Sequence, residues 1–247
     1  MLFRSHHITP PEEKYIVDKY QTLFVDIGAT CYKEVIEMGI DVGAPVVFKP
    51  NFQKLNKTRV YGTSLDNRIA CSILLALSEK ILSEKLENTV YLVGTVQEEY
   101  NLRGGMMAAR SIHPQIAIAL DVALESGTPD TAGVSRVKLG KGPVLSIYNF
   151  HGRGTLNGTI GHPSMVKLFE ETAQRNGIPI QKSVNVGLLT DLSYVQLEGE
   201  GVYSLDVGVP CRYTHSPVES CDLNDLELTT DLLIHVLHNI KKLKMKR

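Results

Sequence analysis

The sequence has almost no net charge and few cysteines, and each of these absences excludes a class of protein. The 26 Lys and Arg residues nearly balance 27 Asp and Glu residues, for a formal net charge of −1. No strong field therefore draws the chain to nucleic acid or to an anionic membrane. The four cysteines, at positions 31, 71, 211 and 221, form no CxxC pair, which argues against a structural zinc site. Their wide spacing suggests free thiols in a reducing compartment.

The sequence also lacks any apolar stretch long enough to span a bilayer, and residues 1–7 contain no apolar core of signal-peptide length. We therefore expect a cytoplasmic protein with neither a membrane nor a nucleic acid among its partners. There is no internal repeat and no low-complexity segment. The remaining composition, 43% hydrophobic and 21% charged over 247 residues, is that of an ordinary globular protein with one large domain and room for a smaller companion.

Two segments of different character meet near residue 58. Residues 1–58 contain short candidate strands at 23–28 and 45–49, bounded by glycine and proline. This pattern predicts a small β-rich module with too little apolar material for a core of its own. Residues 59–247 instead alternate between strand-like and helix-like patterns, which predicts a three-layer α/β/α sandwich with a largely parallel sheet.

The alternation in the second segment gives the expected order of its elements. The predicted strands lie at residues 59–62, 88–96, 115–120, 142–148 and 201–207. The predicted helices lie at residues 65–82, 105–111, 163–176 and 224–242. The apolar run at 88–96 is typical of a strand buried on both faces of a sheet.

Acidic residues follow these predicted strands at several points. Asp66 begins a helix just after a strand, Glu98 and Glu99 follow the next strand, and Asp121 directly follows the one after it. Open α/β sheets place their ligand sites at the carboxyl ends of strands. Carboxylates gathered there would repel one another unless a cation neutralised them. His215, in a loop after a later strand, adds an imidazole, and this donor set suits zinc, cobalt or manganese.

The adjacent glutamates allow a division of labour in hydrolysis. Two metal ions that share a carboxylate activate a bridging water and polarise a carbonyl. One glutamate of the pair would bind metal while its neighbour transfers the proton from water to the leaving group. Each residue also has an ordinary alternative, since Asp66 could complement a helix dipole, the glutamates could be solvated loop charges and His215 could lie in a surface turn. Only their joint placement favours a metal site.

Several motifs, in order along almost the whole chain, resemble the M42 family of metallo-aminopeptidases. Four of them are Ser-Leu-Asp-Asn-Arg at 64–68, Val-Gln-Glu-Glu at 96–99, Ala-Leu-Asp-Val at 119–122 and Arg-Tyr-Thr-His-Ser-Pro at 212–217. The resemblance implies an enzyme that removes N-terminal residues from peptides with a metal-activated water. It also implies a catalytic domain interrupted by a small β-barrel domain, to which residues 1–58 would belong, and a homo-oligomer in the form of a dimer-based dodecamer.

The resemblance assigns a role to each candidate residue. Asp66 would bridge two divalent ions, most simply zinc or cobalt, while Glu99 and His215 complete one site and Asp121 binds the second ion. Glu98 would be the general base. Family members extend further at the N-terminus, where a His-x-Asp motif supplies the remaining ligand of the second ion, and no counterpart is found in this chain. The alternative is therefore a truncated and catalytically impaired homologue.

A second departure from the family pattern lies at residues 187–191. Leu188 and Leu189 stand where relatives usually have glycine, and leucine favours neither a positive φ nor a close backbone approach. This loop borders the substrate site in the family. Two other hydrolase classes fit less well. A serine hydrolase needs a GxSxG elbow that the sequence lacks. A glycosidase would also use paired carboxylates, but the helix-start Asp66 and the loop His215 favour metal chemistry.

Overall fold

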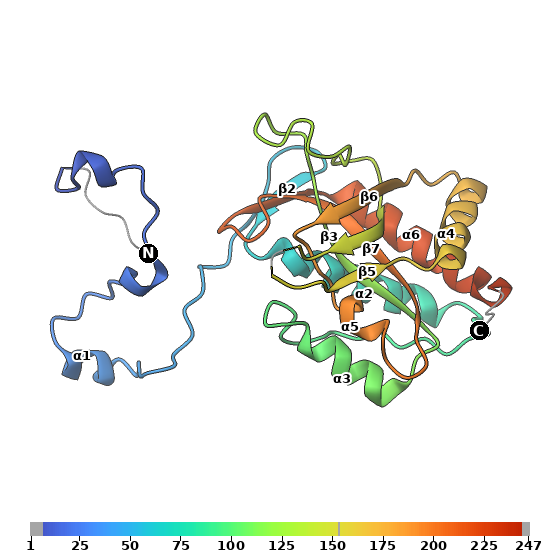
Figure 1. Cartoon of the computed structure of the whole chain (residues 1–247), viewed down its shortest axis with the longest axis horizontal. Coiled ribbons are helices and arrows are strands. Elements are labelled where there is room, and N and C mark those ends of the chain that lie inside the picture. The colour runs from blue at the N-terminus through green and yellow to red at the C-terminus, as the bar shows by residue number, and fades with distance from the viewer. Residues whose placement is uncertain (1–6, 153, 244–247) are drawn as a thin grey trace. The chain divides into compact units, whose positions relative to one another are not determined.

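The computed structural model describes residues 7–152 and 154–243 (Figure 1). The chain divides into two compact units, Met1–Val47 and Phe48–Arg247. In its described residues the first unit has one short helix, α1 (Tyr32–Glu37), and two 3-10 turns, η1 (Pro11–Glu13) and η2 (Tyr20–Thr22).

The strands predicted in the first segment do not form. Residues 23–28 and 45–49 have no strand assignment, and the described chain before Phe52 contains no strand. An extended segment becomes a strand only beside a partner whose N–H and C=O groups it can bond. The assignment of residues 1–58 to a partial β-barrel domain stays a prediction. Residues shortly before 59 belong to the second unit, because β1 (Phe52–Lys54) pairs with β2 (Arg59–Gly62).

The second unit is built on an eight-stranded sheet with the order β1-β2-β8-β7-β4-β5, in which β3 also pairs with β7 and β6 with β4. Among the strands that the structure describes, only the pairs β3–β7 and β4–β6 are parallel. The prediction of a largely parallel sheet is therefore wrong, because short connections such as the turn from β7 to β8 force antiparallel pairing. The remaining strands are β3 (Ile116–Leu124), β4 (Val144–Phe150), β5 (Gly158–Ile160), β6 (Gln181–Val186), β7 (Tyr203–Arg212) and β8 (Glu219–Asp222).

Helices cover both faces of this sheet, which confirms the predicted α/β/α layers. Along β3, Ile116, Ile118 and Leu120 pack into the main core, while Ala117 and Ala119 pack in a separate cluster with Ala109, Leu192 and Val195. Since alternate residues of a strand point to opposite faces, the two clusters lie on opposite sides of the sheet. The helices are α2 (Leu65–Leu82), α3 (Arg103–Ile112), α4 (Pro163–Asn176), α5 (Leu192–Val195) and α6 (Leu223–Asn239), followed by the 3-10 turn η3 (Ile240–Lys242).

The apolar run at residues 88–96 forms no strand, which corrects a second prediction. It has no ladder partner, and Tyr91 and Val96 are 61% and 70% exposed. Among the described strands, β3 pairs only with β7, so its other edge is also open. The run has the composition of a buried strand but lacks the neighbour that would bury it. None of the helices in the described part of the chain has both the length and the apolar character to cross a bilayer.

Candidate metal centre

An irregular start of α2 positions Asp66. The strand β2 ends at Gly62, and Ser64 then adopts a positive φ of 53°. Asp66 and Asn67 have non-helical dihedral angles and are joined by a cis peptide bond. The side-chain oxygen of Asn67 accepts the N–H of Ala70 at 3.0 Å, as an N-cap residue does. The regular helix therefore begins after Asn67, and Asp66 stands just outside it.

Glu98 and Glu99 lie in a tight turn between the extended run and α3. Gln97 has a φ of 58° and Leu102 a φ of 57°, and the N–H of Leu102 donates to the carbonyl of Glu98 at 2.8 Å. Backbone of this kind reverses direction within a few residues. Glu98 is half-buried, whereas the side chain of Glu99 is 61% exposed.

His215 lies in the turn between β7 and β8, where it adopts a positive φ of 61°. Its Nε2 is 3.3 Å from Oδ2 of Asp66 and 3.2 Å from Oε1 of Glu99. One ligand atom from each of these three residues lies within 4.8 Å of the other two. The structure thus brings together three predicted ligands from distant parts of the sequence. One imidazole and two carboxylates leave a tetrahedral ion a free position for water.

Asp121 lies beside this group but is not one of its three members. The strand β3 continues to Leu124 in register with β7, so Asp121 stands within the strand. The prediction that Asp121 directly follows the end of the strand is therefore wrong. Oδ1 of Asp121 accepts the N–H of Val122 at 2.7 Å and the side-chain amide of Asn67 at 3.2 Å. The same amide donates to the carbonyl of Leu120 at 2.9 Å, which ties the start of α2 to β3.

The crowded carboxyl groups hold their protons unusually tightly. Burial, followed by the charge of Glu99, raises the pKa of Asp66 to about 6. The same two causes, in the same order, raise the pKa of Glu98 to about 7. Burial and then the charge of Asp66 raise the pKa of Asp121 well above its usual value. A bound cation reverses shifts of this kind, so the donor set fits a divalent metal ion.

Glu219 is a further residue of this site, and the sequence patterns do not single it out. It is 2% exposed and begins β8. Its carboxylate accepts the backbone N–H of Asp66 at 2.7 Å and that of His215 at 2.9 Å. Its place four residues after His215 was a signal that it lies near the site. No pattern indicates, however, that its side chain turns inward.

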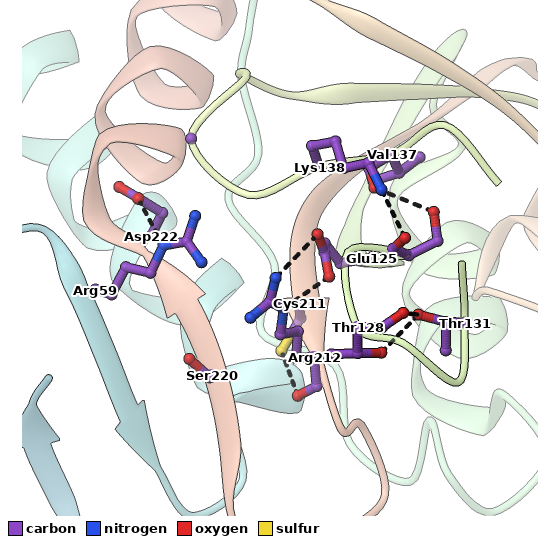
Figure 2. A network of polar contacts seen from close by, with 12 residues as sticks. Arg59, Glu125, Thr128, Thr131, Val137, Lys138, Cys211, Arg212, Ser220 and Asp222 are labelled. Atoms are coloured by element: carbon purple, nitrogen blue, oxygen red, sulfur yellow. Dashed lines mark hydrogen bonds and ion pairs between the residues drawn. The ribbon is translucent and has the colours of Figure 1, made fainter. Parts of the chain in front are cut away.

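A polar network fixes the strand ends next to the site (Figure 2). Arg212, at the end of β7, donates to both oxygens of Glu125, at 2.7 and 3.3 Å. Burial is the largest single influence and acts to raise the pKa of Glu125, but the hydrogen bonds from Arg212 and Gly127 and the positive charges of Arg212 and Lys138 together outweigh it, so the pKa is lowered. Lys138 donates to the carbonyl of Ser126 at 2.6 Å. Glu125 directly follows β3, and Arg212 ends β7. The ion pair of Glu125 and Arg212 therefore joins the strand that holds Asp121 to the strand that leads to His215.

The loop at residues 187–191 contacts both the core and the extended run. The hydroxyl of Thr190 donates to the buried carboxylate of Asp206 at 2.5 Å. The carboxylate of Asp191 accepts the hydroxyl of Thr95 at 2.8 Å, three residues before Glu98. The loop therefore helps to position the turn of the two glutamates. That it also borders a substrate stays a prediction.

Several known proteins that are similar to this chain are named aminopeptidases. The putative aminopeptidase SgcX of Escherichia coli (strain K12) is 38% identical over 223 residues, which are 90% of this chain and 60% of that protein. The structure of aminopeptidase APDkam598 from the archaeon Desulfurococcus kamchatkensis matches with a TM-score of 0.87 at 34% identity, over 96% of this chain and 66% of that one.

A third similar protein is the Pyrococcus horikoshii TET1 peptidase, which can assemble into a tetrahedron or a large octahedral shell. It matches with a TM-score of 0.70 at 31% identity, over 93% of this chain and 66% of that one. The chain thus spans only part of its relatives, 60% in the case of SgcX. The family model described as M42 glutamyl aminopeptidase matches residues 1–232. The chain belongs to this M42 aminopeptidase family.

Proposed function

We propose that this chain carries the catalytic residues of a metal-dependent aminopeptidase, which hydrolyses the N-terminal residue from a peptide by means of an activated water. The observation that carries the proposal is the convergence of Asp66, Glu99 and His215, whose ligand atoms lie within 4.8 Å of one another beside Glu98. Membership of the M42 family supports the same reaction.

Each residue of the site has a distinct part in the proposed mechanism. When bound, a divalent ion among Asp66, Glu99 and His215 supplies the polarisation of the peptide carbonyl and of a water molecule. Zinc or cobalt suits these donors, and Asp121 would contribute to a second ion next to Asp66. Glu98 accepts the proton of the water and returns it to the leaving amine, a role that suits a half-buried carboxyl group next to Glu99.

A second candidate function is that of an impaired homologue, which binds one ion and does not turn over peptides. One observation favours it. Among the described residues, Asp66, Glu99 and His215 form the one group of possible metal ligands, and Asp121 lies outside it. If the protein is an active aminopeptidase, another polypeptide segment, present in the longer relatives, completes the site of the second ion.

The proposed partners follow from the reaction and the family. Peptides are the substrates, and neither nucleic acid nor membrane is involved. The assemblies of the Pyrococcus horikoshii TET1 peptidase support a homo-oligomer, with a dimer-based dodecamer as the specific expectation. The near-zero net charge and the absence of a membrane-spanning helix among the described residues are consistent with a cytoplasmic location, which we also propose.

Metal stoichiometry and turnover together test the proposal. Chelator-treated chain is titrated with Zn²⁺ or Co²⁺ by calorimetry, and hydrolysis of aminoacyl-p-nitroanilides is measured with the loaded protein. Uptake of two ions with turnover that Glu98→Gln lowers by roughly 10²–10⁴-fold, without loss of metal, supports the aminopeptidase. One ion without turnover supports the impaired homologue. Absence of metal binding, or hydrolysis of a cellulosic substrate, would overturn both.

A further inference from the structure

We infer that Glu219 is the positioning residue that sets the spacing of two metal ligands, Asp66 and His215, by holding the backbone of each. The inference rests on the proposed metal site and assigns to it a residue beyond the ligands and the base. Glu219 does not reach the ion or the substrate in this role. It acts through the main chain of the residues that do.

The geometry is that of a clamp with one carboxylate oxygen for each ligand residue. Oε2 of Glu219 accepts the N–H of Asp66 at 2.7 Å, and Oε1 accepts the N–H of His215 at 2.9 Å. The backbone of Glu219 is itself fixed, because it pairs with Gly62 of β2. At 2% exposure the carboxylate is shielded from water that would compete for these bonds.

Both ligand residues need such support, because regular secondary structure does not define their positions. His215 has a φ of 61° and lies in a turn, outside any helix or strand. Asp66 has a φ of −81° and a ψ of 100°, far from helical values, so it lies outside the regular part of α2. A residue with a side chain at positive φ persists only where its surroundings hold it. Glu219 supplies a common anchor for both.

A carboxylate suits this position because it must accept two backbone N–H groups. An ionised glutamate has two acceptor oxygens and no donor, so it can bond two N–H groups at once. A glutamine offers one oxygen and places its NH₂ group against the other N–H. The negative charge of Glu219 also acts on Asp66, which makes the site more favourable for a cation. Hydrogen-bond partners of metal ligands commonly change metal affinity by about 10–100-fold.

Two substitutions and one matched control test this role in the full chain. Glu219→Gln keeps the shape but only one acceptor oxygen, and Glu219→Asp keeps the charge but is too short to reach both N–H groups. The control is Asp225→Asn. Asp225 is fully buried and also accepts two backbone N–H groups, from Gly140 and Gly142 at 2.7 Å each, but these belong to a loop without a proposed ligand.

The probe is Co²⁺ added to chelator-treated protein, read by its affinity and by its visible absorption spectrum, which reports ligand geometry. We expect Glu219→Gln and Glu219→Asp to bind Co²⁺ about 10–100-fold more weakly than the parent, with an altered spectrum. Asp225→Asn should lower the Tm of the metal-free chain and leave both Co²⁺ readouts at parent values. Far-UV circular dichroism checks folding, and Glu219→Asp gives the answer if Glu219→Gln does not fold.

Each other outcome has a definite meaning. Parent affinity and an unchanged spectrum in both Glu219 variants would overturn the inference. An equal loss of affinity in Asp225→Asn would also overturn it, because the effect would then be one of general stability. If the parent chain itself takes up no Co²⁺, the proposed metal site fails and the inference fails with it. If the parent chain binds Co²⁺ and both Glu219 variants bind it equally well, the inference fails but the proposed metal site stands.

Discussion

Asp206 is a buried acid outside the ligand group whose protonation is linked to folding. It is 2% exposed and accepts hydrogen bonds from Thr190 at 2.5 Å and from Asn149 at 2.7 Å. Burial raises its pKa to about 6, although both hydrogen bonds act to lower it. The folded chain therefore binds this proton more tightly than the unfolded chain, in which an aspartate has a pKa near 4.

The sign of the resulting pH dependence follows from linkage. As pH rises from about 4 to about 6, the unfolded chain loses the Asp206 proton first, so the free energy of unfolding falls through that range and is level above it. The full effect of a shift of this size is on the order of 3 kcal/mol. We expect Asp206→Asn to flatten the profile by about that amount, as measured by urea unfolding of chelator-treated protein between pH 4 and pH 7. Parallel profiles for the two proteins would contradict the argument.

At the residue scale, the candidate metal ligands could be predicted from the sequence, but the residue that positions their backbone could not. Asp66, Glu99 and His215 could be proposed from their residue types and their places after predicted strands, and the structure brings them together although the run before Glu99 forms no strand. The role of Glu219 depends on two backbone N–H groups, one of them 153 residues away. Contacts of that kind leave no periodicity or spacing to read.

The side chain of Asn67 stabilises the start of the helix α2. Asn67 caps the helix through its oxygen and ties it to β3 through its amide. We expect Asn67→Ala to lower the free energy of unfolding by about 1 kcal/mol, the usual cost of an N-cap. Asn67→Ser keeps a capping oxygen without the amide and should recover part of this loss. Chemical unfolding of the three proteins measures both effects, and an alanine variant as stable as the parent would exclude the cap.

The ion pair between Glu125 and Arg212 joins the ends of two strands, and its strength is open to measurement. The side chain of Glu125 is 1% exposed and that of Arg212 is 23% exposed. In a double-mutant cycle with Glu125→Gln and Arg212→Met, we expect a coupling of about 2 kcal/mol, as for hydrogen bonds between charged groups. The surface pair Lys80–Asp231, with side chains 47% and 46% exposed, is the control and should couple by less than about 1 kcal/mol. Equal couplings would mean that burial adds nothing.

Helices proved more predictable than strands because their signals are local. The prediction for α4, residues 163–176, agrees with the structure at both ends, where Pro163 begins the helix and Gly177 follows it with a positive φ of 64°. The run at 88–96 has an equally clear apolar pattern, yet it forms no strand. A strand is a property of two segments, and no single segment reveals whether its neighbour is present.

At the scale of the whole molecule, the unpaired run at residues 91–96 leaves an exposed apolar surface. Residues 91–96 are exposed and include Tyr91 at 61%, Val93 at 37% and Val96 at 70%. In the described chain one edge of β3 is also unpaired. The chain spans 60% of the length of SgcX. Additional chain of the kind that the relatives possess is the natural cover for such a surface.

Without that cover, the surface should make the chain self-associate in an open-ended way. An exposed edge recruits further copies, so the mean mass grows with concentration, whereas a closed homo-oligomer keeps one mass over a wide range. Tyr91→Lys places a charge in the middle of the run and should reduce this growth, as measured by light scattering on a concentration series. Val134→Lys is the matched control, since Val134 is 78% exposed but lies in a separate loop. Growth that Tyr91→Lys leaves unchanged, or that both variants reduce equally, would show that the run is not the surface of association.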